Sequence, residues 1–539
     1  MTAAHITQPR APAPAADSPV PRPLAVADKF RLRVQETPDR TALTDGDLEL
    51  TYAQLDRFTD RLAAELLHRG LGPERIVAVD VVHKIEAAVV LLAVLKAGAV
   101  YLPLESGAPA GWKEFVLADS GAALLFVGSD VDTAVAGIPR LRWQRPDVAD
   151  LDRKVPVPAC TAAPGAAACV VYTSGTTGRP KGVCLPRDLL SDHLDAIIAG
   201  FGLRPVDRSL QFSPVHADTA IEQVLSNLVL GATVVVCTER LSVPEMLGLW
   251  ARQRVTVAHL ATGYWHVIAN SLEWRTWPDL PLRLVMVGGD RMSPRAVALW
   301  REKTGIPVLN AYGPTETVIT PNVHPVSDVD DDLGVPIGEV VGDRCSYVLD
   351  ERLQPVPAGT NGELYLGGRM LARGYLGRPG MTARVFLPDP FSDAAGARMY
   401  RTGDIVRRGR EGRLYFIGRA DNQVKYRGFR VELGEIDSVL AQHQAVRDCA
   451  VVAREDRPGD LRLVAYVVPV AADPSPAELR TYLAERLPDH MVPGLFSFLP
   501  GLPLTSSNKV DRRALRGERY RPVTHSVGQA RHDDLADTG

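Results

Sequence analysis

The chain has 539 residues, too many for a single hydrophobic core, so we expect two or more domains. Hydrophobic residues make up 46% and charged residues 23% of the sequence, as in ordinary soluble globular proteins. The net charge of −3 gives no basic excess that would favour nucleic acid or an anionic membrane as a partner. The six cysteines are scattered without a C-x-x-C pair, which argues against a disulfide framework or zinc site and favours a reducing cytoplasm.

The predicted elements begin after a Pro/Ala-rich tail without an apolar secretion signal. Residues 51–54 form a capping box that opens a helix ending at Gly70. Strands and helices then alternate to about residue 335, which predicts an α/β fold with largely parallel sheets. Strands are expected at 76–82, 167–172, 233–236, 255–260 and 282–287, and helices at 85–95, 264–272 and 294–305.

The pattern changes twice after residue 335. Short strands and glycine turns, at 362–368 and 414–418, predict a β-rich subdomain. From about Asp421 the pattern predicts a small α+β domain, with a strand at 461–468 and helices at 434–443 and 476–486. The predicted parts are a disordered tail at 1–25, a large N-terminal core at 26–420, a small C-terminal domain at 421–522 and a disordered tail at 523–539.

The stretch 167–183 joins a buried strand to a loop of hydroxyl residues, glycines and a lysine. Glycines let backbone N–H groups turn towards a ligand, hydroxyls donate further hydrogen bonds, and Lys181 adds a positive charge. This order favours a triphosphate-binding loop over an ordinary surface turn. Residues 178–182 do not fit the pattern G-x-x-x-x-G-K-[ST]. Their spacing differs from it, and Pro180 stands where a helix would begin.

Further motifs follow, each modest alone because turns and solvated loops use the same residues. They are LKAGAVYLP at 95–103, NAYGPTE at 310–316, Gly374-Tyr375, YRTGD at 400–404, GRADNQVK at 418–425, LPDHMVP at 487–493 and NKVDR at 508–512. In this order and spacing, from about residue 50 to 515, the chain resembles the amino-acid adenylation domains of nonribosomal peptide synthetases. These belong to the adenylate-forming superfamily, together with acyl-CoA ligases and luciferases.

The resemblance implies the fold of that superfamily and an AMP-forming ligase in nonribosomal peptide and antibiotic biosynthesis. Such enzymes join an amino acid to the α-phosphate of ATP, release pyrophosphate, and pass the aminoacyl group to the phosphopantetheine thiol of a carrier protein. Thr315 and Glu316 would lie near the α-phosphate, with Glu316 helping to hold Mg²⁺. Lys509 would bridge the substrate carboxylate and the phosphate, although the usual Asn-Gly-Lys is here Ser-Asn-Lys. Asp421 matches the hinge of the small domain.

The resemblance also implies residues that bind the nucleotide. Tyr312 would stack on adenine, and Asp404, assisted by Arg419, would accept hydrogen bonds from the ribose hydroxyls. The implied set is Thr173, Ser174, Gly175, Thr176, Thr177, Gly178, Lys181, Gly289, Asn310, Ala311, Tyr312, Gly313, Asp404, Phe416 and Arg419.

A third set corresponds to the amino-acid pocket of the family. Asp218 falls where members that activate α-amino acids keep an aspartate for the ammonium, although the preceding residue, usually phenylalanine, is Ala217. The implied lining is Asp218, Thr219, Glu222, His259, Met286, Gly288, Ala311, Ile319 and Thr320, with Lys509 closing the pocket.

Asp218 and Glu222 stand four residues apart, on one face of the helix that this segment should begin. Two carboxylates facing a partly desolvated pocket would repel and raise each other's pKa. A cationic substrate group would relieve this, which predicts a basic amino acid: lysine, ornithine, a shorter diamino acid, β-lysine or arginine. Alternatively, Glu222 points at solvent or pairs with His259, and the substrate is a small polar amino acid.

Two other functions fit the sequence less well than amino-acid activation. An acyl- or aryl-CoA ligase is disfavoured by Asp218, an unpaired buried charge beside an apolar acyl chain. A non-catalytic adenylation-like module is disfavoured by Glu316, Asp404 and Lys509. No carrier domain or Gly-Gly-x-Ser attachment site follows Lys509, so we expect a free-standing cytoplasmic enzyme that loads a separate carrier protein. The need for a small MbtH-like helper stays open.

Overall fold

The structure is a computed structural model. It describes residues 24–522, apart from 132–134, 136, 145–154, 158–159, 161, 175–178, 238–240, 272–279, 328, 331–332, 410, 421–422, 427, 457–459 and 504–509. The predicted tails therefore lie outside the described residues, except for Leu24 and Ala25.

The chain groups into two compact units. The large unit comprises Met1–Thr173, Pro180–Asp421 and Arg427–Phe429, and the small unit comprises Ser174–Arg179, Asn422–Tyr426 and Arg430–Gly539.

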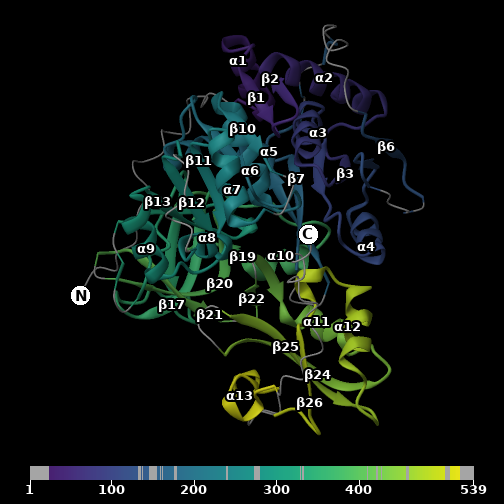
Figure 1. The fold of residues 1–539 in the computed structure, drawn as a ribbon, viewed down its shortest axis with the longest axis vertical. Helices are drawn as coiled ribbons and strands as arrows, with labels where there is room; N and C mark the ends of the chain where they lie inside the picture. The colour runs from purple at the N-terminus through teal and green to yellow at the C-terminus, as the bar shows by residue number, and fades with distance from the viewer. Residues whose placement is uncertain are drawn as a thin grey trace, which may run out of the picture. The chain divides into compact units, whose positions relative to one another are not determined.

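One layer of the large unit is a seven-stranded sheet with the order β18-β8-β7-β4-β3-β5-β6 (Figure 1). Its central strands run parallel, and β8 runs antiparallel to β7. Strands β3, β4 and β5 are buried along their whole lengths, as expected for a parallel sheet covered on both faces. The bounds are β3 Ile76–Asp80, β4 Val100–Pro103, β5 Leu124–Val127, β6 Arg140–Arg142, β7 Ala167–Thr173, β8 Lys181–Pro186 and β18 Gly374–Tyr375.

A second layer is a nine-stranded sheet with the order β15-β14-β13-β12-β11-β9-β10-β1-β2. The run from β13 to β1 is parallel, and β14, β15 and β2 are antiparallel additions at the two edges. The bounds are β1 Thr41–Thr44, β2 Glu49–Thr51, β9 Arg208–Gln211, β10 Thr233–Val236, β11 Val257–Ala261, β12 Leu284–Gly288, β13 Val308–Tyr312, β14 Asn322–Pro325 and β15 Glu339–Val340.

Helices α3 (Lys84–Lys96), α5 (Arg187–Phe201) and α6 (Asp218–Leu230) pack between these sheets and share one hydrophobic core with them (Figure 1). Helix α3 is apolar almost all round because it is covered on every side. A second core lies under α7 (Val243–Arg252), α8 (Thr262–Ala269) and α9 (Pro294–Thr304) on the nine-stranded sheet, and a third lies under α4 (Ala110–Ser120) on the seven-stranded sheet.

The helix boundaries follow the predicted signals. Helix α2 (Tyr52–His68) begins with the capping box of Thr51 and Gln54, preceded in the chain by α1 (Val26–Glu36). Helix α9 begins at Pro294 after the N-cap Ser293 and ends before Gly305, whose φ of 64° is left-handed.

The predicted β-rich part is an antiparallel sheet with the order β16-β17-β20-β19, to which β21 is added beside β20. The bounds are β16 Arg344–Leu349, β17 Asn361–Gly368, β19 Phe386–Pro388, β20 Arg398–Arg408 and β21 Leu414–Arg419, with α10 at Pro379–Val385. The strands β22 (Gln423–Tyr426) and β23 (Phe429–Glu432) follow as a separate pair.

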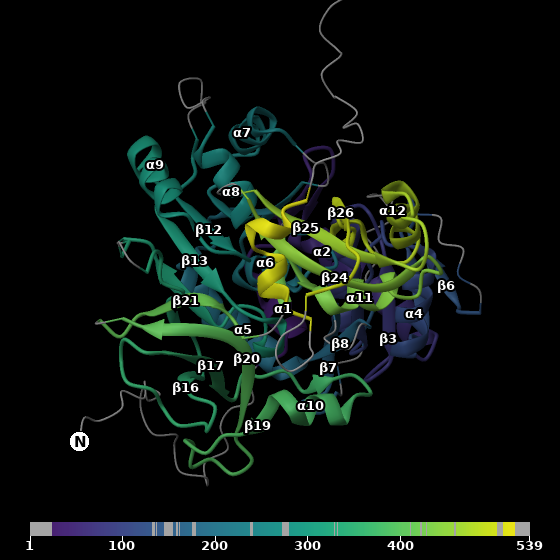
Figure 2. The same ribbon diagram turned by 90° about the horizontal axis from the view of Figure 1, so that it is seen from below.

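The small unit contains the three-stranded sheet β24-β25-β26, with α11 and α12 beside it (Figure 2). The bounds are α11 Leu433–Leu440, β24 Val446–Glu455, β25 Leu461–Pro469, α12 Pro476–Ala484, β26 Leu495–Phe498 and α13 Arg512–Leu515. The predicted fold class, a large α/β part with a β-rich subdomain and a small α+β part, is confirmed.

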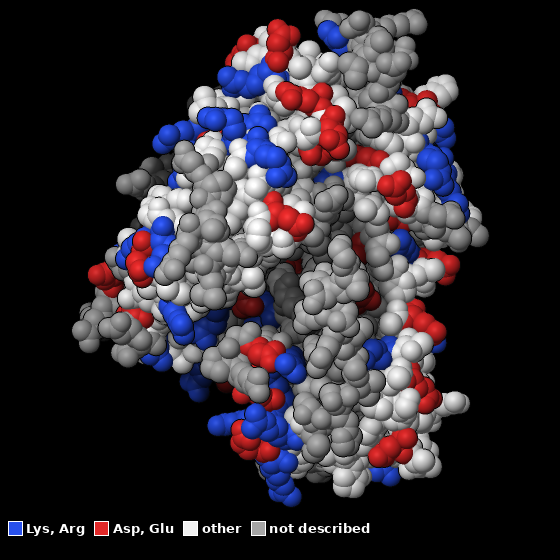
Figure 3. All heavy atoms as spheres, in the orientation of Figure 1, with Lys and Arg blue, Asp and Glu red and all other residues white. Residues whose placement is uncertain are grey.

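Acidic and basic side chains are interspersed over the face drawn in Figure 3, in keeping with the small net charge. Among the described residues, no helix is long and apolar enough to span a bilayer.

Candidate active site

The predicted triphosphate-binding loop connects the antiparallel neighbours β7 and β8. Thr173 ends β7, and its buried hydroxyl has no hydrogen-bond partner within the described part of the chain. Buried hydroxyls are rarely left unpaired, so this donor fits a site that an oxygen-rich ligand completes. The Ser174 hydroxyl donates to the Arg430 carbonyl at 2.7 Å, within the small unit. Four more predicted positions, Gly175, Thr176, Thr177 and Gly178, lie outside the described residues.

Lys181, Glu316 and Tyr375 form a buried cluster at the start of β8. The Lys181 Nζ donates to the Tyr375 hydroxyl at 3.1 Å and lies 3.7 Å from the Oε1 of Glu316. The Tyr375 hydroxyl donates to the same Oε1 at 2.8 Å. Glu316 is fully buried, and a buried carboxylate needs such partners to stay charged. The predicted phosphate-binding lysine and the predicted Mg²⁺-binding glutamate therefore meet in one cluster.

A strained turn follows β13. The 3-10 helix Thr315–Thr317 carries the predicted catalytic residues Thr315 and Glu316. No residue with a side chain fits at Gly313, because a Cβ there would lie 2.0 Å from the carbonyl oxygen of Ile319. Val318 and Ile319 have φ angles of 57° and 70°, which β-branched residues rarely adopt. Backbone strain of this kind persists only where surrounding contacts hold it, and it concentrates at functional sites.

Three predicted nucleotide-binding side chains meet between β13, β20 and β21. The Tyr312 hydroxyl donates to one oxygen of Asp404, and the Arg419 Nη1 donates to the other at 2.5 Å. Burial, with the nearby Asp404 charge, raises the pKa of the Tyr312 phenol well above its usual value. Phe416 packs in the same hydrophobic cluster as Tyr312, and the Asn310 amide donates to the Pro336 carbonyl at 2.7 Å.

Asp218 is the first residue of α6 and contacts the strained turn. Its Oδ2 accepts a hydrogen bond of 2.6 Å from the Thr315 hydroxyl, and its Oδ1 accepts one of 2.7 Å from the backbone N–H of Thr219. Burial raises the pKa of the Asp218 carboxyl to about 6, and repulsion from Glu222 adds to the rise. The predicted ammonium-binding carboxylate is thus joined to the predicted catalytic turn.

Glu222 lies one helical turn further along α6 and is buried. Its Oε2 lies 2.7 Å from the Nε2 of His193, and its Oε1 accepts a hydrogen bond of 3.3 Å from Thr320 and lies 4.0 Å from the Nδ1 of His259. Burial acts to raise the pKa of Glu222, but these contacts outweigh it and lower the pKa below its ordinary value. The expected mutual rise in pKa is therefore correct for Asp218 and wrong for Glu222, because His193 of α5 faces the second carboxylate.

Four predicted pocket residues stand on neighbouring parallel strands. His259 is on β11, Met286 and Gly288 are on β12, and Ala311 on β13 is the register partner of Gly288. A cavity of about 10 Å³ is lined by Glu222, His259 and Met286, with room for about one water molecule. Its wall also includes two buried polar atoms without a hydrogen-bond partner among the described residues, Ser209 Oγ and Asn227 Oδ1.

Two sequence patterns of known enzymes match the chain. The pattern of the AMP-binding enzyme family matches residues 30–376, and that of the AMP-binding enzyme C-terminal domain matches residues 435–509. The chain belongs to this family. It is an adenylation domain of the adenylate-forming superfamily, and therefore an AMP-forming ligase.

The adenylation domain resembles parts of much longer peptide synthetases. It is 37% identical over 511 residues to a dimodular nonribosomal peptide synthase of Bacillus subtilis, covering 91% of this chain and 21% of that protein. It is 40% identical over 492 residues to phosphinothricin tripeptide synthetase PhsC of Streptomyces viridochromogenes, covering 89% of this chain and 44% of that protein. The chain thus spans less than half the length of either relative.

Among solved structures, the adenylation domain is similar to NpsA-ThdA, an artificially fused adenylation-PCP di-domain from Klebsiella oxytoca. The TM-score is 0.78 with 27% sequence identity, over 89% of this chain and 94% of that one.

Two predicted residues of the adenylation domain, Lys509 and the hinge Asp421, lie outside the described residues. Sequence analysis did not assign three others that the structure brings to the site, namely Tyr375, His193 and Arg344. Tyr375 could have been found, because Gly374-Tyr375 is one of the motifs that carry the resemblance. His193 and Arg344 belong to no motif. The packing of α5 against α6 brings His193 to Glu222, and Arg344 of β16 contacts His193 in turn.

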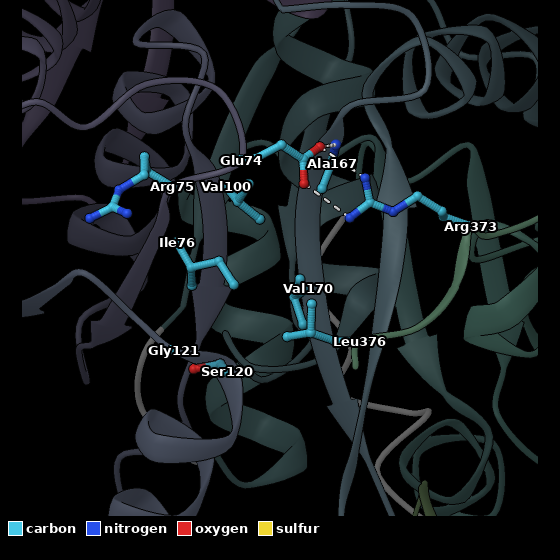
Figure 4. A pocket seen from close by; sticks show the side chains of 10 residues that line it. All are labelled: Glu74, Arg75, Ile76, Val100, Ser120, Gly121, Ala167, Val170, Arg373 and Leu376. Atoms are coloured by element: carbon cyan, nitrogen blue, oxygen red, sulfur yellow. Dashed lines mark hydrogen bonds and ion pairs between the residues drawn. The ribbon is translucent and has the colours of Figure 1, made fainter. Parts of the chain in front are cut away.

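A separate pocket of about 170 Å³ lies at the opposite edge of the seven-stranded sheet, where β3, β4 and β7 begin. Figure 4 shows Glu74 and Arg373 next to each other at one side of this pocket, joined by hydrogen bonds of 2.9 and 3.0 Å. Glu74 also accepts the backbone N–H of Ala167 at 2.8 Å. None of the predicted site residues lines this pocket, and the Glu74 carboxylate already has its partners within the adenylation domain.

Proposed function

We propose that this adenylation domain activates an α-amino acid as its aminoacyl-AMP, with release of pyrophosphate. The observation that carries the proposal is the 2.6 Å hydrogen bond from Thr315 to Asp218. It joins the turn that resembles the α-phosphate site of the family to a carboxylate that can receive a substrate ammonium. A substrate held there by its ammonium would present its carboxylate beside Thr315 and Glu316, and such positioning is a large part of catalysis.

The residues present suit ATP as the second substrate. Thr173 supplies a hydroxyl that has no partner among the described residues, and Lys181 supplies a positive charge for the β- and γ-phosphates. Tyr312 would stack on adenine, and Asp404, oriented by Arg419, would accept from the ribose. Glu316 would hold Mg²⁺ together with phosphate oxygens, and the metal would neutralise phosphate charge.

In the proposed reaction a substrate carboxylate oxygen attacks the α-phosphorus, and the bond to the β-phosphate breaks. Lys509 would neutralise charge at this step. The phosphopantetheine thiolate of a carrier protein would then attack the aminoacyl carbonyl and release AMP. Movement of the small domain about Asp421 would separate the two half-reactions. The proposed location of the enzyme is the cytoplasm. A small MbtH-like helper protein is a further candidate partner.

Glu222 does lie 4.0 Å from His259, as the alternative of a small polar substrate expects, but the charge state of this pair favours a basic amino acid. Its lowered pKa keeps this carboxyl ionised at neutral pH. Within the described part of the chain its ion-pair partners are two histidines, His193 and His259, and burial lowers the pKa of both. Two neutral imidazoles therefore leave the negative charge without a contacting cation among the described residues. An ammonium or guanidinium on the substrate side chain would supply that cation.

Amino-acid-dependent exchange of labelled pyrophosphate into ATP tests the proposed activation. Each amino acid is compared with the same acid lacking its α-amino group, and free coenzyme A is compared with a phosphopantetheinylated carrier protein as the acceptor. We expect exchange with an α-amino acid, little with the des-amino acid, and transfer to the carrier. Equal use of the des-amino acid with transfer to coenzyme A would indicate an acyl- or aryl-CoA ligase. No exchange with any acid would indicate a non-catalytic module.

A further inference from the structure

A chain of buried side chains links Glu222 to Arg344 through His193. The three side chains come from different elements: Glu222 from α6, His193 from α5 and Arg344 from β16. The His193 Nε2 lies 2.7 Å from the Oε2 of Glu222, and the Arg344 Nη2 lies 3.2 Å from the Nδ1 of His193. All three are at most 3% exposed, so solvent does not compete for these contacts.

The order of donors in this chain fixes the state of His193. A guanidinium can only donate, so the Nδ1 that faces Arg344 must accept and carries no proton. The single ring proton therefore lies on Nε2 and is donated to Glu222. His193 thus holds the Oε2 of Glu222 as a neutral donor, which orients the carboxylate without cancelling its charge.

Arg344 also holds the strained turn that forms another wall of the predicted pocket. Its Nη2 shares two hydrogens among three acceptors, the Nδ1 of His193 and the carbonyl oxygens of Thr317 and Val318 at 3.0 and 3.1 Å. Its Nη1 donates to the Val341 carbonyl at 2.8 Å. Two residues further along, Thr320 donates to the Oε1 of Glu222. One guanidinium therefore fixes both the turn that carries Thr320 and the imidazole that orients Glu222.

We propose that His193 and Arg344 are positioning residues that set the side-chain selectivity of this enzyme, by holding Glu222 as an oriented, charged acceptor. The proposal rests on the amino-acid activation proposed above. The His193 imidazole occupies Oε2, so Oε1 is the oxygen on the side of Thr320 and His259, two of the predicted pocket residues. A substrate side chain ending in an ammonium or guanidinium donates to this oxygen, which a neutral side chain of the same length cannot do.

The test uses the full chain and measures KM and kcat by pyrophosphate exchange. The substrates are the amino acid that the wild type uses best and an analogue that lacks only its terminal polar group. His193→Leu removes both hydrogen bonds of the imidazole. We expect roughly a 10-fold or larger rise in KM for the preferred amino acid, no such rise for the analogue, and a nearly unchanged KM for ATP.

A conservative variant separates positioning from structural support. In His193→Gln the amide places an acceptor and a donor at about the spacing of the two ring nitrogens. We expect it to recover most of the selectivity that His193→Leu loses. Recovery of folding without recovery of the substrate ratio would contradict the proposal, even where His193→Leu itself fails to fold.

Arg187 provides a matched control for Arg344. It is also a buried arginine of the large unit, and it donates to the carbonyls of Leu95, Ala99 and Ala167. Arg344→Lys should lower the preference for the amino acid over its analogue by about 10-fold, because one ammonium cannot replace the branched guanidinium. Arg187→Lys should lower thermal stability and leave this preference unchanged.

Three outcomes would separately refute the positioning roles, the basic substrate and the proposed function. Equal losses in kcat/KM for amino acid and analogue in the His193 and Arg344 variants would refute the positioning roles and leave amino-acid activation standing. A wild type that prefers an apolar amino acid would refute both the positioning roles and the basic substrate. A wild type without amino-acid-dependent exchange would refute the proposed function itself.

Discussion

The two ends of the candidate active site hold their buried carboxylates in different ways. At one end Glu316 lies 3.7 Å from the ammonium of Lys181. At the other end Asp218 and Glu222 accept hydrogen bonds from groups that carry no charge, a threonine and a histidine. At the first end the carboxylate therefore lies directly beside a cation, whereas at the second the cation Arg344 reaches Glu222 only through the neutral His193.

This difference matches what each end is proposed to bind. A phosphate site must present positive charge, so its carboxylate is kept close to a cation and can share a metal ion. An amino-acid site must attract an ammonium, so its carboxylates are oriented by neutral donors.

Removing the charge of Glu316 should have the largest effect. Glu316→Gln keeps the size of the side chain and an acceptor for Tyr375, but it removes the proposed metal ligand. We expect kcat for pyrophosphate exchange to fall by roughly 10²–10³-fold, the range seen when one electrostatic group of an active site is lost. Glu86→Gln is the control, because Glu86 is also buried but its carboxylate contacts Ser129. Similar kcat values for the two variants would contradict the role of Glu316 as a metal ligand.

Removing the charge of Asp218 should act on the amino acid and spare ATP. A hydrogen bond to a charged group contributes about 1.5–3 kcal/mol, so Asp218→Asn should raise the KM for the amino acid by roughly 10- to 150-fold. Steady-state exchange kinetics with each substrate varied in turn will measure this. A comparable rise in the KM for ATP would show that Asp218 supports the whole site.

The pH dependence should follow the carboxyl of Asp218. Its pKa is raised to about 6, so the carboxylate is charged above that pH and becomes protonated as the pH falls below it. Protonation removes the partner of the substrate ammonium, and kcat/KM for the amino acid should fall by about tenfold per pH unit below 6. Asp218→Asn should abolish this limb of the pH profile. A wild-type profile flat from pH 7 to 5 would contradict the role.

The turn that joins the two ends should tolerate no side chain at Gly313. Gly313→Ala forces a Cβ against the carbonyl oxygen of Ile319, and overpacking of this kind costs about 1–3 kcal/mol. We expect a lower melting temperature, measured by circular dichroism, together with weaker exchange. Gly263→Ala in α8 is the control, since among the described residues no atom outside the backbone of its own helix lies within 4 Å of the position that its Cβ would take. It should leave stability unchanged or slightly higher.

The smallest effect is expected at Tyr312. Tyr312→Phe keeps the ring proposed to stack on adenine and removes only the hydroxyl that donates to Asp404. One hydrogen bond contributes about 0.5–1.5 kcal/mol, so the KM for ATP should rise by roughly 2- to 10-fold. The KM for the amino acid should stay the same, and a change there would argue against the division into two ends.

Much of the Lys181 end could be predicted from sequence, because its residues stand in short motifs next to strands. The β7–β8 loop and the turn after β13 each combine a strand end with glycines and functional side chains. Lys509 and residues 175–178 of the β7–β8 loop lie outside the described residues, so their roles stay predictions.

The Asp218 end was only partly predictable. Helical spacing correctly placed Asp218 and Glu222 on one face of α6. The pKa and orientation of Glu222 depend on His193 and Arg344. His193 lies 29 residues before Glu222 in the chain, and Arg344 lies 151 residues after His193. Their contacts arise from packing of three separate elements, and no local pattern encodes them. The expected rise in the pKa of Glu222 was wrong for that reason.

The central claim is that the Asp218 end keeps a negative charge for the substrate side chain. The most direct measurement compares kcat/KM for basic amino acids with that for neutral analogues of matched length, such as lysine with norleucine and arginine with citrulline, in the wild type and Glu222→Gln. We predict that the wild type prefers a basic amino acid by about 10-fold or more, and that Glu222→Gln loses most of this preference. Equal use of basic and neutral partners by the wild type, or a preference that Glu222→Gln leaves intact, would contradict the claim.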